Sequence, residues 1–256
     1  MPRQTLSQRL HEVAEASCRV FIDKGYRRTL VSDVAEELGL SQGAVYGYVE
    51  SKEALFHLAM VFAISADRIR ELSIPVPTPP PGGTLALLQG WAPSSGFPVL
   101  ATALKRRRPP DVRVELTSVI DERYRLLEDN QRLLSLIERS AQDLPDLSDL
   151  YFQHWRRDQI SDLALYIRKR VSSGHLRAVP DVPTAARFIV ETIAWFAWHR
   201  KRDPDSAMIS DEDARTTVTA LLLAAFVPEA ESGSGSSAPL SSRTSKPPKA
   251  RSGASG

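Results

Sequence analysis

The sequence has few of the features that mark secreted, membrane-spanning or disulfide-linked proteins. Cys18 is the single cysteine, so no intramolecular disulfide can form, and residues 1–10 contain no apolar stretch of the kind found in secretory signals. The longest apolar runs are about the size of residues 220–227, far short of the roughly 18 residues that a membrane span needs. We therefore expect a cytoplasmic protein with no membrane contact.

An excess of positive charge is also missing from most of the chain. Residues 1–60 carry seven basic and eight acidic side chains, residues 61–231 carry 22 and 23, and residues 232–256 carry four and none. The net charge of +2 therefore comes from the last segment. Bulk charge gives no support to nucleic-acid binding by the folded part, so such binding must depend on where individual residues lie.

Signatures of catalysis, cofactor binding and metal binding are absent from the sequence as well. The five histidines are dispersed, and none clusters with a cysteine or carboxylate at metal-ligand spacing. No glycine-rich phosphate loop follows a strand, and there is no G-x-S-x-G motif. We assign no metal, no cofactor and no catalytic residue, and we expect that the protein is not an enzyme.

Helical periodicity dominates what the sequence does contain, and no strand alternation competes with it. Apolar spacing predicts helices over residues 5–24, 30–38, 42–48, 51–73, 85–91, 98–107, 111–142, 147–173, 184–201 and 211–226. Ser41 and Ser51 are predicted N-caps, and Ser210 with Asp213 is similar to a capping box. Gly174 is predicted to end a helix. The fold class is therefore all-α.

Two segments interrupt the helical pattern. Residues 75–83 contain five prolines and two glycines, which exclude helix and strand and predict an extended connector. Residues 231–256 are rich in serine, glycine and proline, with Leu240 as the only large apolar side chain. Such a segment cannot bury enough surface to offset its ordering entropy, so we predict a disordered basic tail.

The segment from Gly25 to Leu55 predicts a helix-turn-helix. Two short helices meet at residues 39–41, and Ala35 is small enough for them to cross closely. The second helix begins at Ser41, so its N-terminal amides face outward. That arrangement suits insertion of the helix end into a major groove beside phosphates.

Over this segment the sequence resembles the TetR family of transcriptional regulators. The residues that carry the resemblance are Phe21, Gly25, Tyr26, Thr29, Val34, Ala35, Gly39, Leu40, Ser41, Gly43, Tyr46, Tyr48, Lys52 and Leu55. The resemblance is strongest over residues 5–60, and the rest of the chain matches only in being helical and of suitable length. It implies an N-terminal three-helix DNA-binding domain and a C-terminal helical domain that binds ligand and dimerises. We expect these at residues 1–50 and 51–230, followed by the tail at 231–256.

The resemblance also implies roles for individual residues in DNA binding. The groove-facing set is Gln42, Gly43, Ala44 and Gly47; the set near phosphates or flanking bases is Thr29, Val31, Ser32, Tyr46, Tyr48 and Lys52. Lysine in the first turn of a helix opposes the helix dipole unless an anion faces it, which agrees with a phosphate contact by Lys52. Arg3, Arg9, Arg27 and Arg28 would add phosphate contacts that make binding salt-dependent.

Base readout has few candidates in this sequence. Ala44 and Gly47 are small, which leaves Gln42 as the main side chain able to pair with a base, through a bidentate contact to adenine. The operator sequence therefore does not follow from the chain.

Aromatic residues of the C-terminal part are candidates for an effector site. Each aromatic taken alone is more often a core residue than a ligand contact. Together they can line a largely apolar cavity for a small molecule. The candidates are Trp91, Phe97, Tyr124, Tyr151 and Trp155.

The last two predicted helices are apolar over more than one face, so they need a second packing partner. We expect that partner to be a second copy of the chain, in a four-helix bundle. The expected interface residues are Ile189, Ile193, Phe196, Val218, Leu221 and Leu222.

The function that these observations predict is a regulator, by family resemblance a repressor, that binds a palindromic double-stranded DNA operator as a homodimer. A small, largely apolar effector in the C-terminal domain would release it, with an unbroken helix over residues 51–73 transmitting the change. The alternative is a helical small-molecule-binding protein without DNA activity.

Overall fold

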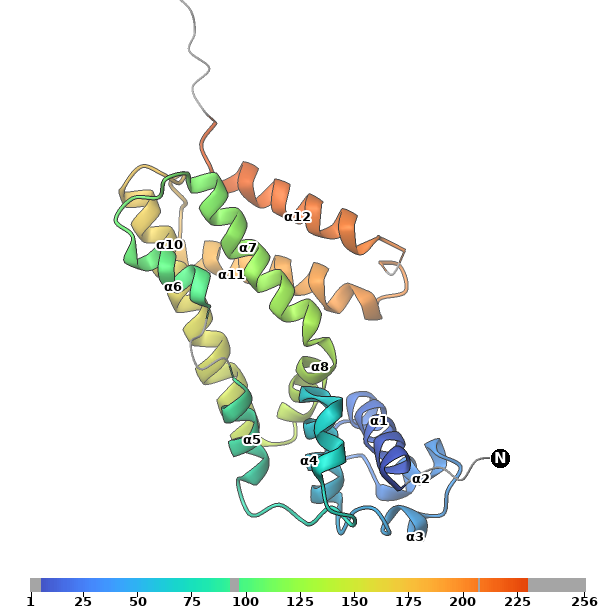
Figure 1. Ribbon diagram of the computed structural model, residues 1–256. Helices are drawn as coiled ribbons and strands as arrows, with labels where there is room; N and C mark the ends of the chain where they lie inside the picture. The colour runs from blue at the N-terminus through green and yellow to red at the C-terminus, as the bar shows by residue number, and fades with distance from the viewer. Residues whose placement is uncertain (1–5, 93–96, 207, 230–256) are drawn as a thin grey trace, which may run out of the picture.

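A computed structural model describes residues 6–92, 97–206 and 208–229, and the secondary-structure elements of that part of the chain are helices (Figure 1). An isolated parallel bridge between Val49 and Val76 is the one β-type pairing there, so the all-α prediction is confirmed. The α-helices are α1 (Leu6–Lys24), α2 (Val31–Glu37), α3 (Gln42–Val45), α4 (Lys52–Ile64), α5 (Gly83–Trp91), α6 (Pro98–Lys105), α7 (Val112–Asp129), α8 (Gln131–Ala141), α9 (Pro145–Ser148), α10 (Arg157–Ser172), α11 (Val182–Ala197) and α12 (Asp211–Phe226). Two 3-10 segments, η1 (Ala66–Glu71) and η3 (His199–Arg202), and a π-helical segment, η2 (Asp149–Arg156), complete the set.

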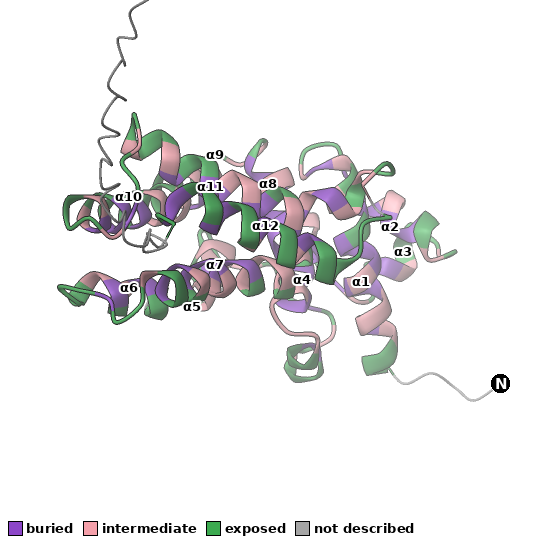
Figure 2. Ribbon diagram, turned by 90° about the horizontal axis from the view of Figure 1, so that it is seen from above, coloured by how far each residue is buried: buried purple, intermediate pink, exposed green. Residues whose placement is uncertain are grey.

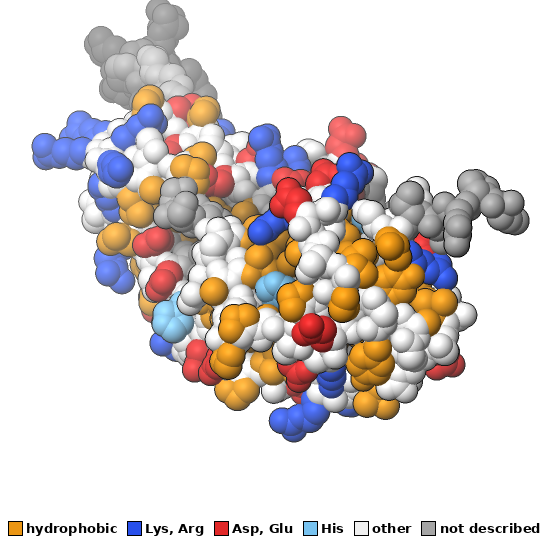
Figure 3. Space-filling view, turned by 60° about the horizontal axis from the view of Figure 1, so that its bottom comes forward, with side chains coloured by type: hydrophobic (Ala, Val, Ile, Leu, Met, Phe, Trp, Pro, Cys, Tyr) orange, Lys and Arg blue, Asp and Glu red, His pale blue; other side chains and the backbone are white. Residues whose placement is uncertain are grey.

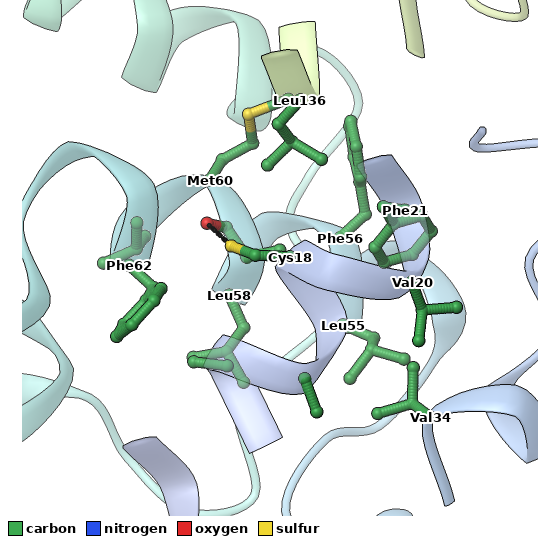
Figure 4. Close-up of a cluster of buried hydrophobic side chains, with 14 of the residues drawn as sticks. Cys18, Val20, Phe21, Val34, Leu55, Phe56, Leu58, Met60, Phe62 and Leu136 are labelled. Carbon is green, nitrogen blue, oxygen red and sulfur yellow. Dashed lines mark hydrogen bonds between the residues drawn. The ribbon is translucent and has the colours of Figure 1, made fainter. Parts of the chain in front are cut away.

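Helices α1 to α4 form an N-terminal bundle built around α1 and α4 (Figure 4). The α1 helix buries one stripe that includes Val13 and Phe21, whereas α4 is buried on most sides because α1, α5 and α8 all pack against it. The Cys18 thiol donates to the Ala59 carbonyl at 3.1 Å. Burial raises the pKa of Cys18 to about 12, so the thiol stays protonated at neutral pH.

A second core lies between α6, α7, α10, α11 and α12. A buried ion pair ties three of these helices together. Arg170 of α10 donates from Nε to Glu115 Oε1 of α7 at 2.7 Å, and from Nη2 to the carbonyl of Ala103 of α6 at 2.8 Å. Because both charges are paired and the guanidinium is also bonded to backbone, the pair fits inside an apolar core.

The predicted helix caps are confirmed. Each serine hydroxyl accepts a hydrogen bond from the backbone amide three residues later in the chain. The distances are 3.2 Å for Ser41, 3.0 Å for Ser51 and 3.0 Å for Ser210. The expected capping box at α12 is incomplete, because the Asp213 carboxylate accepts from the Ser210 hydroxyl at 2.6 Å. Gly174 follows α10 with φ of +72°, a left-handed backbone that suits glycine at a helix end.

Two helices expected to be continuous are broken. The predicted helix over residues 51–73 ends at Ile64, because Ser65 has extended dihedrals, and the chain resumes as the 3-10 segment η1 with Ile69 buried. The predicted helix over residues 111–142 divides at Asn130, whose Nδ2 donates to the Leu126 carbonyl at 2.8 Å. An asparagine side chain that competes for backbone carbonyls weakens a helix at that point.

The proline-rich connector is extended, as predicted, and it packs against the N-terminal bundle. The Val76 amide donates to the Tyr48 carbonyl at 2.8 Å, and the Glu50 amide donates to the Val76 carbonyl at 3.1 Å. The Val76 side chain is buried there. The connector therefore fixes the chain between α3 and α4.

The expected boundary at residue 50 falls inside the first core, since α4 packs on α1 and on α8 of the C-terminal part. The division at residues 50 and 230 stays a prediction. The tail predicted for residues 231–256 lies outside the described residues, as does Arg3. No helix among the described residues is long and apolar enough to cross a membrane.

Candidate nucleic-acid interface and effector cavity

The α2–α3 pair has the geometry of a helix-turn-helix. Gly39 takes a φ of +64° after α2, which turns the chain so that the Leu40 amide donates back to the Ala35 carbonyl at 2.8 Å. Ala35 and Val45 are buried between the helices. The turn leaves α3 at the edge of the molecule (Figure 1).

The exposed face of α3 carries most of the predicted groove-facing residues. Gln42, Gly43 and Gly47 are exposed, Ala44 is half-buried, and Tyr46 is 44% exposed. A Cβ added at Gly43 would meet no heavy atom within 4 Å, so that position is open to solvent. Among the described residues, Gly43 therefore leaves room for a nucleic-acid backbone or base edge to approach the start of α3.

Two residues of the predicted DNA-binding set are not available at the surface. Thr29 is fully buried and its hydroxyl donates to the Gly25 carbonyl at 2.7 Å, so it braces the turn before α2. Val31 is 5% exposed and packs into the bundle core. The structure thus corrects these two expectations. Ser32 and Tyr48 are half-buried and stay in the predicted set.

Lys52 sits beside the turn before α2, and its cation has partners within the chain. Its Nζ donates to the Arg27 carbonyl at 3.2 Å and lies 4.7 Å from the centre of the Tyr26 ring. These contacts offset the unfavourable position of a lysine in the first turn of α4. They also hold the ammonium group near the exposed Arg27 and Arg28.

The face that carries α3 has isolated basic side chains rather than a continuous basic surface (Figure 3). Arg9 pairs with Glu12 at 2.5 Å, and Arg19 pairs with Glu37 at 2.9 Å. Electrostatic attraction to a polyanion would therefore come from few positions, chiefly those near Lys52.

The end of α8 and Asp143, just after it, are joined to the end of α1 and to the turn that precedes α2. Asp143 Oδ2 accepts the Arg27 amide at 2.8 Å, and Arg139 Nη2 donates to the Asp23 carbonyl at 3.2 Å. Gly25 lies between them with φ of +83°, and a Cβ there would be 2.9 Å from Asp143 Oδ2. Glycine is needed at this position both for its dihedral and for the close approach of the carboxylate.

A cavity of about 230 Å³ lies between α5, α7, α8, η2, α10 and α11. Four of the five predicted effector residues line it, namely Trp91, Phe97, Tyr151 and Trp155. The π-helical geometry of η2 is a rare local widening of the helix that often occurs at functional sites, and it carries Tyr151 and Trp155 into the cavity wall. Tyr124 is fully buried in the second core and is not part of the lining.

The polar part of the cavity was not predicted from the sequence. Arg123, Glu138 and Arg156 line it together with Trp198 and further residues of α10 and α11. A signal for Arg123 does exist in the sequence. It follows Leu116, Val119 and Ile120 on the apolar stripe of α7, where a charged residue is unexpected.

The predicted interface residues lie mostly inside the protomer. Ile189, Ile193, Val218 and Leu222 are at most 2% exposed, because α7, α10, α11 and α12 cover them. Phe196 is half-buried and Leu221 is 65% exposed.

The antiparallel α11–α12 pair has exposed turns on both helices (Figure 2), and three large apolar side chains are among its exposed residues. Phe188 and Trp195 are seven residues apart on α11 and are 54% and 44% exposed. We use the name α11–α12 face for these two residues together with Leu221 of α12, which is 65% exposed.

Comparison with known proteins finds a family whose model matches the helix-turn-helix segment. Residues 13–59 match the model of the bacterial regulatory proteins of the tetR family. Two Bacillus subtilis proteins named as uncharacterized HTH-type transcriptional regulators each match a short part of the chain. YerO is 34% identical over 59 residues, which is 23% of this chain and 20% of that protein. YfiR is 45% identical over 49 residues, which is 19% of this chain and 24% of that protein. The match thus spans between a fifth and a quarter of these relatives.

Solved structures show the same fold over most of the chain. The ketosteroid transcriptional regulator KstR2 of Mycobacterium tuberculosis has a TM-score of 0.52 at 16% identity, covering 88% of this chain and 98% of that one. A bacterial regulatory protein in the tetR family from Rhodococcus RHA1 has a TM-score of 0.50 at 17% identity, covering 88% and 100%. At sequence identities of 16% and 17%, this similarity is evidence of a shared fold.

Proposed function

We propose that this chain, whose residues 13–59 match the model of the tetR family of bacterial regulatory proteins, is a ligand-responsive transcriptional repressor of that family that binds DNA as a homodimer. The observation that carries the proposal is the exposed face of α3, with Gln42 and Gly43 open to solvent at the capped end of the helix. A helix end with free amides and small side chains can enter a major groove beside phosphates. Lys52, beside the turn before α2, would supply a cation for the DNA backbone.

The homodimer is proposed to form through the α11–α12 face. Phe188, Trp195 and Leu221 present large apolar side chains to solvent, and burying such side chains against a second copy is favourable by about 25 cal/mol per Å². A twofold pairing buries the same face on both protomers. Two α3 helices would then reach successive major grooves about 34–36 Å apart, or a multiple of that, on a palindromic operator.

The cavity between α5, α7, α8, η2, α10 and α11 is proposed as the effector site. The α8 helix places Leu134 and Glu138 in the cavity wall and Arg139 at the joint with the turn before α2. A ligand that shifts α8 would therefore move that turn and change the spacing of the recognition helices. This route replaces a continuous helix over residues 51–73, since α4 ends at Ile64.

Selection of binding sites from random duplex DNA by the immobilised full chain tests the proposal. We expect an inverted repeat bound by two protomers. If no sequence is enriched while the cavity binds small molecules, the protein is instead a helical small-molecule-binding protein without DNA activity.

A further inference from the structure

We propose that the cavity takes a small, largely apolar monocarboxylic acid, whose carboxylate is bound by the guanidinium of Arg123. The inference rests on the proposed function only in treating this cavity as the effector site.

Arg123 is a buried cation with incomplete pairing. It is 6% exposed, and its Nη2 donates to Gln159 Oε1 at 2.8 Å. Its Nε is buried without a hydrogen-bond partner, and no carboxylate of the described residues forms an ion pair with it. Buried charged groups in proteins are normally paired, so this cation has unused capacity to bind an anion.

Apart from Glu138, the acidic residues near Arg123 are either paired with another arginine or exposed to solvent. Each of the two carboxylate oxygens of Glu191 accepts a hydrogen bond from Arg156 Nη2 at 2.6 Å. Glu191 also forms an ion pair with Arg187 at 2.7 Å. Asp158 and Asp162 line the outer part of the cavity on α10 and are exposed. Glu138 on α8 is half-buried, so among the three acids of the described lining it would attract a cationic ligand most strongly.

Burial lowers the pKa of Arg123 to about 10, so the guanidinium is still charged at neutral pH. The Phe97 ring lies 5.1 Å from its central carbon and holds its plane. A planar fork of donors in a low-dielectric site matches a carboxylate better than a neutral or cationic group.

The remaining lining explains the apolar part and the size of the ligand. Trp91 and Trp155 lie against one another with ring centres 5.9 Å apart, and Tyr151 and Val190 add further apolar surface. The cavity volume of about 230 Å³ is below the roughly 300–1,000 Å³ of drug-sized sites. A ligand of the size of phenylacetate or hexanoate fits this description.

Size-matched probes test the proposal on the full chain. Phenylacetate, phenylacetamide and phenethylamine form one series, and hexanoate, hexanamide and hexylamine form the other. Binding at neutral pH is followed by the fluorescence of the cavity tryptophans, including Trp91 and Trp155, and by titration calorimetry. We expect each carboxylate to bind about tenfold or more tightly than its amide and amine.

Variants assign the recognition to one residue. R123M should remove the preference for the carboxylate, whereas R125M, which changes an exposed arginine on the same helix, should leave it unchanged. The comparison of carboxylate, amide and amine probes on the wild-type protein needs no variant. It therefore tests the preference for a carboxylate even if R123M does not fold.

Three results would overturn the inference: equal binding of carboxylate and amide, tighter binding of the amine, which would indicate Glu138 as the recognising residue, or no binding of either carboxylate at millimolar concentration. If the chain binds its selected duplex and one of these results is found, the inference fails and the regulator proposal stands. If carboxylates bind through Arg123 but do not release the duplex, the inference stands and the proposed ligand response fails.

Discussion

The Asp143 carboxylate accepts the backbone amide of Arg27 at 2.8 Å, which joins the end of α8 to the turn in front of the helix-turn-helix. The two residues are 116 positions apart in the chain. Because α8 also carries Glu138 in the cavity wall, a single helix lies between the proposed effector site and the bundle that we propose to bind DNA. This gives the two sites a direct physical connection.

Asp143→Ala should reduce the effect of bound ligand on DNA affinity, while the protein still binds both ligand and DNA. Coupling free energies between such sites are typically about 1–3 kcal/mol, or about 5- to 150-fold in affinity. We expect the ratio of DNA affinities without and with ligand to fall at least about threefold, because α8 no longer has its hydrogen bond to the Arg27 amide. Asp146→Ala, an exposed acid on α9, is the matched control. An unchanged ratio in Asp143→Ala would show that coupling takes another route.

Lys52→Ala should weaken binding to cognate and random duplexes alike, because a phosphate contact carries no sequence information. The slope of log affinity against log salt should fall by about one for each phosphate that the variant no longer neutralises. Fluorescence anisotropy over a range of salt concentrations measures both quantities. Lys105→Ala, an exposed lysine at the end of α6, serves as the control. Weaker binding of the cognate duplex alone would assign Lys52 to base recognition instead.

Gln42→Ala should cost about 1–3 kcal/mol on the cognate duplex and leave binding to random DNA unchanged. The reason is that Gln42 is the one exposed side chain of α3 able to form a bidentate contact with adenine. When the selection from random duplex DNA is repeated with Gln42→Ala, the selected sequences should show a weaker base preference at one base step. Gln153→Ala, an exposed glutamine of η2, is the control. Equal reductions in affinity on both DNAs would mean that Gln42 does not read bases.

Leu221→Lys should convert the dimer to a monomer while leaving helix content unchanged. Leu221 is 65% exposed, so a lysine there meets water in the free protomer but would be buried in the proposed interface. Sedimentation velocity at micromolar concentration distinguishes the two states. Leu165→Lys, at a 50% exposed position on α10, should remain a dimer. A wild-type monomer under these conditions would contradict the proposed assembly.

Asp33→Asn should lower the free energy of unfolding by about 1 kcal/mol at neutral pH. The Leu30 amide and then the Lys24 ammonium lower the pKa of Asp33 in the folded state. A carboxylate with a depressed folded pKa stabilises the fold above its unfolded pKa of about 3.9, and that contribution disappears as pH falls through the folded pKa. Urea unfolding measured from neutral pH to about pH 3 should therefore show that the free energies of unfolding of the wild type and of Asp33→Asn become more similar as the pH falls. Glu36→Gln, an exposed acid on the same helix, should show no such trend.

Local chemistry made much of the fold predictable from the sequence. Ser41, Ser51 and Ser210 act on amides three residues away, and Gly39 and Gly174 adopt dihedrals that few other residues tolerate. Such features depend on neighbours in the chain, so a pattern is enough to find them. The breaks at Ser65 and Asn130 depend on tertiary packing and on one side-chain hydrogen bond, which periodicity does not register.

The candidate sites were less predictable for the same reason. Apolar spacing in α11 shows that two faces are apolar, but it does not say which face is covered by the protomer, so the prediction places Ile189 and Ile193 on the wrong side. The burial of Thr29 follows from its bond to Gly25, which only the folded turn creates. Arg123 escapes prediction because an isolated charge in an apolar stripe acquires meaning only with the cavity around it.

The most direct test of DNA binding by a twofold dimer is to measure the affinity of the full chain for two duplexes. One is the selected duplex, and the other is the same duplex with one half-site randomised. Both affinities are measured over a range of salt concentrations. We expect a linear fall of log affinity with log salt, and much weaker binding to the duplex with one half-site, because two α3 helices must reach two grooves. Affinity that is independent of salt, or equal for the two duplexes, would contradict the proposed function.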